Sequence, residues 1–190
     1  TPNVDETFAH LQGLAMAGDP PKAFTRPVGL PEGEKDASFR TVAVRDGVFP
    51  GGRVYFCEHH TPELVWRPEW QSHGNGGQAM PDFVIASTNH QEEAEAFAKL
   101  LCSNVSGDGD SLGVGFKGGQ LTIMSPAAYG ERYGASASPM AGRASIFGAL
   151  VIRTDSLDKI RAIASPAIDE AERVVMREGS FDAVLEFVNR

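Results

Sequence analysis

The sequence predicts an α+β fold built from repeated modules that each combine one helix with several short strands. Helical and strand patterns alternate along the whole chain. The same order of elements returns after roughly 60 to 70 residues, which is typical of an internal structural repeat. A single unit of this kind leaves one face of its sheet uncovered, so we expect the units to pair and bury it.

The first module is predicted over residues 1–60. A helix is expected at residues 4–17, where apolar residues recur at helical spacing and Asn3 can cap the first turn. Alternation of apolar and polar residues predicts the strands that follow, at residues 23–28, 39–45 and 53–59. A connection rich in Trp, Pro and Gly spans residues 61–81, and long connections of this kind are linkers or functional loops.

The second and third modules are predicted at residues 82–135 and 143–190, where we expect them to pair with each other. The second has an apolar strand, a helix with one apolar face and a hairpin around Gly118-Gly119. Its elements are expected at residues 82–87, 91–102, 112–117 and 120–124, followed by a short helix at 127–133. The third module is expected at residues 147–153, 157–164, 173–177 and 183–188.

The composition is that of an ordinary globular protein and excludes some classes of function. Of the 190 residues, 42% are hydrophobic and 22% are charged. The net charge of −8, without a local Lys/Arg cluster, argues against a nucleic-acid partner. No apolar stretch is long enough to span a membrane. We expect a cytoplasmic protein whose two cysteines, Cys57 and Cys102, are free thiols.

One region of the first module resembles the glyoxalase-like domain family. The resemblance rests on the run Phe56-Cys57-Glu58-His59-His60-Thr61-Pro62-Glu63 with a trailing Trp66, and on His73-Gly74-Asn75-Gly76 further along. The family belongs to the vicinal oxygen chelate superfamily, together with glyoxalase I, bleomycin-resistance proteins and extradiol dioxygenases. The resemblance implies repeated βαβββ modules whose curved mixed sheets pair around a cavity.

Two features of the chain depart from the family's pattern. The family usually has Pro where this chain has Gly74, so we expect a different local turn. The first module begins with its helix, without its first strand and without a partner module before it. Because such proteins commonly carry four modules, we expect this chain to be part of a longer protein.

The resemblance implies a divalent metal, with Zn, Fe, Mn and Ni as the candidates, held by His and Glu side chains of paired modules. Glu58 and His59 are the predicted catalytic residues, and Glu58, His59 and His60 are predicted metal ligands. Strand alternation places Cys57 and His59 on one face and Glu58 and His60 on the other, and the sequence leaves open which face lines the cavity. The alternative is that these side chains fix the following connection by hydrogen bonds.

Glu186 is a further predicted metal ligand, in the last strand of the third module. The usual ligand position in the second module is Asp82, and the matching position in the third is Gly148 or Ala149, neither of which can bind metal. Asp82 and Glu186 without a histidine make a poor transition-metal site. We therefore expect Glu186 to be either exposed or bonded to an arginine, because a buried unpaired carboxylate is costly.

Several other residues are candidates for binding a substrate. Arg26 and Arg40 can bind an anionic group through two hydrogen bonds each, or can form ion pairs within the protein. Trp66 and Trp70 lie four residues apart, which predicts one helical turn burying both rings, as a lid or as a staple between modules. His73 precedes the first strand of the second module. Cys57 is a candidate nucleophile or a core residue.

Two functions fit these observations. The first is a metal-dependent enzyme, an isomerase, lyase or dioxygenase, acting on a small oxygenated substrate. The second is a metal-free small-molecule-binding protein of the same fold, as in bleomycin-resistance-type sequestration. In both cases we expect a homodimer whose partner is a small molecule and neither a nucleic acid nor a membrane.

Overall fold

The computed structural model describes residues 1–189, and Arg190 lies outside the described part. The chain divides into two compact units. Unit 1 contains Thr1–Phe49 and Arg53–Gln71, and unit 2 contains Pro50–Gly52 and Ser72–Arg190. Each unit has its own sheet and its own buried clusters, so each is described by itself.

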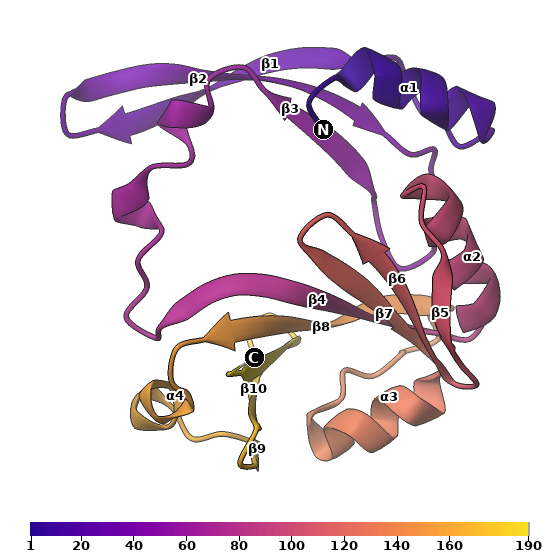
Figure 1. The fold of residues 1–190 in the computed structure, drawn as a ribbon, viewed down its shortest axis with the longest axis vertical. Coiled ribbons are helices and arrows are strands. Elements are labelled where there is room, and N and C mark those ends of the chain that lie inside the picture. Colours follow the sequence, from indigo (N-terminus) through magenta and orange to yellow (C-terminus); the bar gives the residue numbers. More distant parts are fainter. Residues whose placement is uncertain (190) are drawn as a thin grey trace. The chain divides into compact units, whose positions relative to one another are not determined.

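Unit 1 is one helix on a three-stranded antiparallel sheet (Figure 1). The strands pair in the order β1-β2-β3, and their bounds are β1 Lys22–Leu30, β2 Gly33–Ala43 and β3 Tyr55–His59. Helix α1 (Val4–Gly13) begins where Asn3 accepts hydrogen bonds from the first turn, as the sequence predicts. It buries Val4 and Leu11.

The connection after β3 forms two separate 3₁₀ turns, η1 (Pro62–Leu64) and η2 (Pro68–Trp70). The prediction of one helical turn that buries both tryptophan rings is wrong. Trp66 is 62% exposed and Trp70 is 44% exposed. Pro68 lies between them, and a proline disfavours helical backbone at the residue before it, so the turn cannot continue from one tryptophan to the other.

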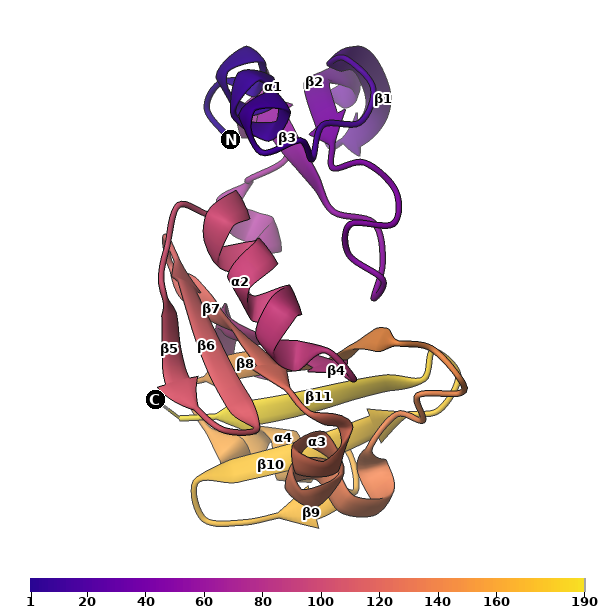
Figure 2. The ribbon, with the colours of Figure 1, turned by 90° about the vertical axis from the view of Figure 1, so that its right-hand side faces the viewer.

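Unit 2 contains two βαβββ modules that share one eight-stranded mixed sheet (Figure 2). The first module is β4 Gly77–Ser87, α2 His90–Leu100, β5 Val105–Asp108, β6 Ser111–Phe116 and β7 Gly119–Met124. The second module is β8 Ser145–Thr154, α4 Leu157–Ile163, β9 Ile168–Asp169, β10 Arg173–Glu178 and β11 Ala183–Val188. In each module the last strand pairs in parallel with the first, and β4 and β8 pair antiparallel at the centre. The predicted fold class, α+β with βαβββ modules and mixed sheets, is confirmed.

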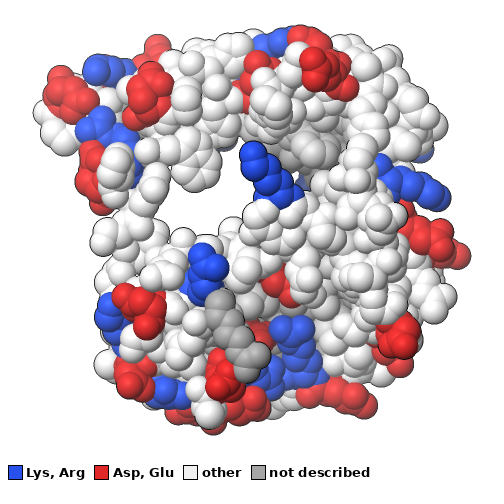
Figure 3. Space-filling model, viewed as in Figure 1, with Lys and Arg blue, Asp and Glu red and all other residues white. Residues whose placement is uncertain are grey.

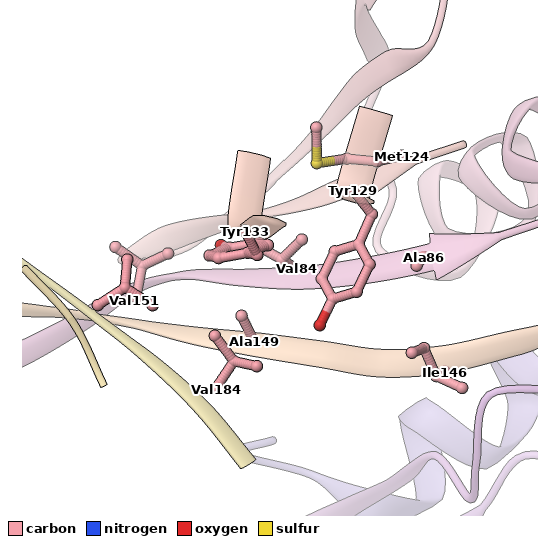
Figure 4. Close-up of a cluster of buried hydrophobic side chains, with 10 residues drawn as sticks. Val84, Ala86, Met124, Tyr129, Tyr133, Ile146, Ala149, Val151 and Val184 are labelled. Carbon is pink, nitrogen blue, oxygen red and sulfur yellow. The ribbon is translucent and has the colours of Figure 1, made fainter. Parts of the chain in front are cut away.

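A helix from the segment between the modules covers one face of this sheet. Helix α3 (Pro126–Tyr133) is followed by η3 (Gly134–Ser136) and packs Tyr129 and Tyr133 onto apolar side chains of β4, β8 and β11 (Figure 4). The Tyr129 hydroxyl donates to the carbonyl oxygen of Gly148 at 2.8 Å. A Cβ atom at Gly148 would lie 2.6 Å from the Tyr129 ring, so the close approach requires glycine.

The module helices cover the opposite face. Leu157 and Ile160 of α4 pack with Val174 and Phe187, whereas the strand neighbours Val175 and Val184 belong to the cluster under α3. No helix among residues 1–189 is long and apolar enough to cross a membrane. On the side seen in Figure 3, Lys and Arg side chains are interspersed with Asp and Glu, which is not the continuous basic surface that nucleic acids require.

Candidate functional site

The sheet of unit 1 has one face covered by α1 and a second face without an α-helix. Arg40 and Glu58 are cross-strand neighbours that both bond to α1, so they lie on the helix side. Phe39 and His59 are the adjacent pair and therefore lie on the other side. We call this second side the aromatic face. By strand pairing it contains Lys22, Phe24, Arg26, Ala37, Phe39, Thr41, Cys57 and His59.

On the helix side, charged groups bind α1 to the sheet. Glu58 Oε2 accepts a hydrogen bond from the backbone N–H of Val4 at 2.9 Å, and Glu58 Oε1 lies 3.3 Å from His60 Nε2. A carboxylate is favoured there because the first N–H groups of a helix have no intrahelical partner. Arg40 donates two hydrogen bonds to Asp5, at 2.7 and 2.9 Å, and this guanidinium holds the pKa of Asp5 below its usual value. These side chains fasten the helix.

His59 lies on the aromatic face between two aromatic rings. Its ring meets Phe39 edge-on at 5.1 Å and lies 5.7 Å from the Trp66 ring. The Nδ1 atom of His59 is buried and has no hydrogen-bond partner among residues 1–189. A buried polar atom without a partner costs free energy, so such an atom in a native fold requires an explanation, of which a bound molecule is one.

The aromatic face continues across β2 and β1. Phe24 stacks on Phe39 with ring centroids 5.2 Å apart and planes inclined by 20°. The guanidinium carbon of Arg26 lies 5.8 Å from the centre of the Phe24 ring. Phe24 is 38% exposed, so this stack presents apolar surface to solvent. Of the predicted catalytic pair, His59 belongs to this surface and Glu58 does not.

The predicted metal ligands in β3 do not form one set. Glu58 and His60 lie on the helix side and His59 on the aromatic side, so a single ion cannot be bound by all three. The two oxygens of Glu58 are already engaged by a backbone N–H and by His60. Among residues 1–189, no group of three or more His, Cys, Asp or Glu side chains is placed to hold a metal ion. The residues present therefore do not fit the expected shared site.

Glu186 lies buried beneath α3 in unit 2, with its side chain 4% exposed. Its Oε2 atom accepts hydrogen bonds from Arg132 at 2.9 and 3.1 Å and from the Tyr133 hydroxyl at 2.7 Å. Arg173 lies 3.9 Å from Oε1. Burial raises the pKa of Tyr133, which keeps that hydroxyl a proton donor. The expectation that Glu186 bonds to an arginine is confirmed, and a carboxylate surrounded by these cations does not fit a metal site.

Asp82 and Glu186 lie level with each other across the sheet of unit 2. Each pairs in register with Val151, which lies between them on β8. The third-module residue at the ligand position is therefore Val151, and the prediction of Gly148 or Ala149 is wrong. Asp82 Oδ2 accepts from Thr122 at 2.6 Å and from Gln120 at 3.2 Å, and its Oδ1 is buried without a partner in residues 1–189. Valine supplies no ligand, so this row also does not fit a metal site.

The four predicted substrate-binding residues separate into different places. Arg26 belongs to the aromatic face and Trp66 lies beside His59, so these two share the surface around His59. Arg40 lies on the helix side, paired with Asp5. His73 belongs to unit 2, where its carbonyl oxygen accepts the N–H of Gly76 in a turn before β4.

Sequence reasoning missed Phe24 and Phe39, which form the centre of the aromatic face. It also missed a pocket of about 600 Å³ in unit 1, near the start of β1 and the end of β2. The alternation of Lys22, Phe24 and Arg26 along β1 was a usable signal, because it places all three on one face. The pairing of Phe24 with Phe39 needs the hairpin register, which a single strand does not reveal.

Comparison with known proteins gives a similar fold without an established function. No family model and no curated protein match the chain. A hypothetical protein from Staphylococcus aureus is similar in structure, with a TM-score of 0.63 and 8% sequence identity. The similarity covers 98% of this chain and 62% of that protein. Methylmalonyl-CoA epimerase from Mycobacterium tuberculosis gives a TM-score of 0.43 at 12% identity, over 60% of this chain and 88% of that one.

At 8% identity the first similarity supports the fold alone. Together with the strand order of unit 2, it defines the class as α+β proteins built from βαβββ modules. One fold of this kind hosts many chemistries, so the function has to be argued from the site.

Proposed function

We propose that this chain is a glyoxalase-like small-molecule-binding protein whose ligand lies on the aromatic face of unit 1, with His59 as its polar contact. The observation that carries the proposal is the buried, unpartnered Nδ1 atom of His59 between Phe39 and Trp66. A ligand oxygen or N–H at that atom would satisfy it. The proposal assigns no step to a metal ion, because Glu58 and His59 lie on opposite faces.

The surroundings of His59 suit a small, partly apolar molecule. Aromatic side chains supply a large apolar contact area at fixed geometry, and a few polar groups then orient the ligand. Here the exposed Phe24 ring stacks on the buried Phe39, Trp66 stands 62% exposed beside His59, and Arg26 lies at the edge. A small molecule with an aromatic or other apolar part and an oxygen-bearing group matches this arrangement.

Proton transfer to or from such a ligand is a second candidate function, and the same atom favours it. Histidine exchanges protons near neutral pH, and a general base needs a free ring nitrogen within reach of its substrate. His59 Nδ1 makes no hydrogen bond to any of the residues that the structure describes. In this case the ligand is a substrate, and the chain is an isomerase or lyase of proton-abstraction type.

Tryptophan fluorescence tests the binding proposal directly. The chain has two tryptophans, so the variant Trp70→Phe leaves Trp66 as the single reporter. In this background, small oxygenated aromatic compounds should quench the Trp66 emission in a saturable way. His59→Ala should weaken binding about tenfold, the equivalent of one lost hydrogen bond of ~1.4 kcal/mol.

His60→Ala is the matched control, because His60 is the next residue and lies on the helix side with Glu58. It should leave the affinity unchanged. Equal losses in both variants, or no saturable quenching across a broad set of compounds, would contradict the proposal. Following the bound compounds by NMR separates the two functions, since only an enzyme converts them or exchanges their acidic protons with solvent.

A further inference from the structure

The pocket of unit 1 begins where the aromatic rings of the same face end. Lys22, Thr41 and Ala43 line the pocket and stand at alternate strand positions beyond Phe24 and Phe39. Side chains two residues apart on a strand share a face and are separated by about 7 Å. The aromatic face therefore has an apolar end around His59 and a polar end in this pocket.

The polar end has an excess of positive charge in a chain whose net charge is −8. Lys22, Arg45 and Arg53 line the pocket together with Asp19 and Asp46. Lys22 is paired with Asp19 at 2.6 Å, so these two charges largely cancel. That leaves two guanidinium groups and one carboxylate, an excess of one positive charge.

Neither arginine forms an ion pair of 4 Å or less with a carboxylate in the described part of the chain, although Arg53 is near enough to Asp19 to help lower the pKa of that carboxyl. Arg45 reaches only the carbonyl oxygen of Ala15, at 3.4 Å, and Arg53 lies over the Tyr55 ring at 5.9 Å. By contrast, most other arginines of the chain pair with Asp or Glu at 4 Å or less. A guanidinium presents paired N–H donors that fit a carboxylate or a phosphate.

We propose that Arg45 and Arg53, in the pocket at the polar end of the aromatic face, bind the anionic carboxylate or phosphate group of the ligand. Arg45 lies six residues beyond Phe39, roughly 20 Å at the rise of an extended strand, so a ligand that reaches both ends is a long molecule with an apolar ring at one end and an anion at the other. This description of the whole ligand rests on the proposed function of the aromatic face. The anion site itself depends only on the pocket.

The experiment compares two charged compounds with one neutral relative. 12-Phenyldodecanoate and 11-phenylundecyl phosphate carry an anion at the far end of a long chain from a ring, and 12-phenyldodecanamide lacks the charge. Binding is measured by isothermal titration calorimetry at constant ionic strength. Wild-type protein should bind at least one charged compound about tenfold more tightly than the amide, and the better of the two identifies the anion. Arg45→Gln/Arg53→Gln should abolish that advantage and leave the affinity for the amide unchanged.

Lys99→Gln/Lys117→Gln is the matched control, because it also removes two positive charges but both residues belong to unit 2, outside the pocket lining. It should keep the preference for the charged compounds. Loss of the preference in this control would assign the effect to net charge and overturn the anion site. Far-UV circular dichroism checks that both double variants are folded.

A second experiment titrates inorganic phosphate or acetate alone into the protein and follows the arginine signals by NMR. It distinguishes a failure of the anion site from a failure of the proposed function. If ring compounds bind but the arginine variant treats all three alike, the anion site is wrong and the proposed function stands. If no ring compound binds, the proposed function fails. The anion site is then supported if either ion shifts the Arg45 and Arg53 signals saturably and the arginine variant loses this binding. It is overturned if neither ion binds.

Discussion

The two units differ in what covers the sheet face that lies opposite their module helices. In unit 2 the face opposite the module helices is covered by α3, and Tyr129 and Tyr133 fill it (Figure 4). In unit 1 the face opposite α1 has no α-helix on it. Leu64 and Val65 pack with Ala37 and Phe39 there, while the Phe24 ring stays 38% exposed and His59 Nδ1 has no hydrogen-bond partner among residues 1–189. The comparison teaches that a face of this fold is either packed by the chain's own residues or available to another molecule.

The polar groups follow this division only in part, because Asp82 Oδ1 and Glu93 Oε2 of unit 2 are also buried without a hydrogen-bond partner among residues 1–189. Beneath α3, Glu186 has three donor groups around it, which supply its hydrogen bonds and balance its charge. On the aromatic face, His59 Nδ1 has no hydrogen-bond partner within residues 1–189, and Arg26 lies over the Phe24 ring instead of beside an acid. Buried polar groups in a closed core have to be satisfied internally, whereas those of a binding site are satisfied by the ligand.

The largest expected effect comes from removing the carboxylate under α3. Glu186→Ala leaves Arg132, Arg173 and Tyr133 without their common partner, and breaking a buried ion pair from one side costs about 3 to 5 kcal/mol. We expect a loss at the lower end of that range, because the Arg132 side chain is 27% exposed. Urea unfolding followed by far-UV circular dichroism measures it, and a loss below about 1 kcal/mol would show that Glu186 does not hold α3 in place.

A slightly smaller effect is expected at the point where α3 approaches the sheet. Gly148→Ala places a methyl group 2.6 Å from the Tyr129 ring, so the ring or the strand must shift. Overpacking of this kind costs about 1 to 3 kcal/mol. Gly13→Ala is the matched control, because among residues 1–189 no atom outside its chain neighbours and its own helix backbone lies within 4 Å of a Cβ atom there. The same unfolding experiment should show no loss in the control, and equal stabilities of the two variants would contradict the close packing.

The fold was largely predictable because its elements repeat strong local patterns. Asn3 marks the start of α1, and the alternation around Gly118-Gly119 marks the hairpin of β6 and β7. Strand β5 was missed because its four residues, Val-Ser-Gly-Asp, are all exposed and carry a single apolar side chain. The two-residue strand β9 has too few residues for any period to show.

The site was only half predictable, because its decisive contacts join distant parts of the chain. Local alternation separates His59 from Glu58, but the choice of face depends on the bond between Glu58 and Val4, 54 residues away. The sequence likewise predicts that Glu186 is either exposed or bonded to an arginine, but it does not identify Arg132, which lies 54 residues before it. Periodicity reports which residues share a face and says nothing about what packs on it.

The variant Trp66→Ala tests the difference between the two units through ligand affinity. Removing this exposed ring from beside His59 should weaken a bound aromatic compound by ~0.5 to 1.5 kcal/mol while leaving folding stability nearly unchanged. Tyr129→Ala is the opposite case, because its ring lies in the packed face, and it should cost stability without changing affinity. Calorimetric titration together with urea unfolding measures both quantities. If Trp66→Ala lowered stability and Tyr129→Ala lowered affinity, the assignment of the aromatic face to binding and of the face under α3 to packing would be wrong.

The smallest expected effect is the pH dependence of the Asp5–Arg40 pair. The hydrogen bond from Arg40 lowers the pKa of Asp5 in the folded state below its ordinary value of 3.8. The contribution to stability is therefore present above that ordinary pKa and is lost as the pH falls through the lowered folded-state pKa. Asp5→Asn should be less stable than wild type near neutral pH, and the difference should vanish in strong acid. Tryptophan fluorescence reports this transition in unit 1, and a difference that persists unchanged at low pH would contradict the pairing.

The most direct test of the account is the imidazole nitrogen spectrum of His59. Long-range ¹H–¹⁵N NMR of uniformly labelled protein resolves the ring nitrogens, and His59→Ala and His60→Ala assign their signals. On titration with a bound aromatic acid, the account predicts a saturable shift of His59 Nδ1 with no change at His60. A ligand that binds the chain while leaving His59 Nδ1 unmoved would contradict the claim that the aromatic face is the binding site.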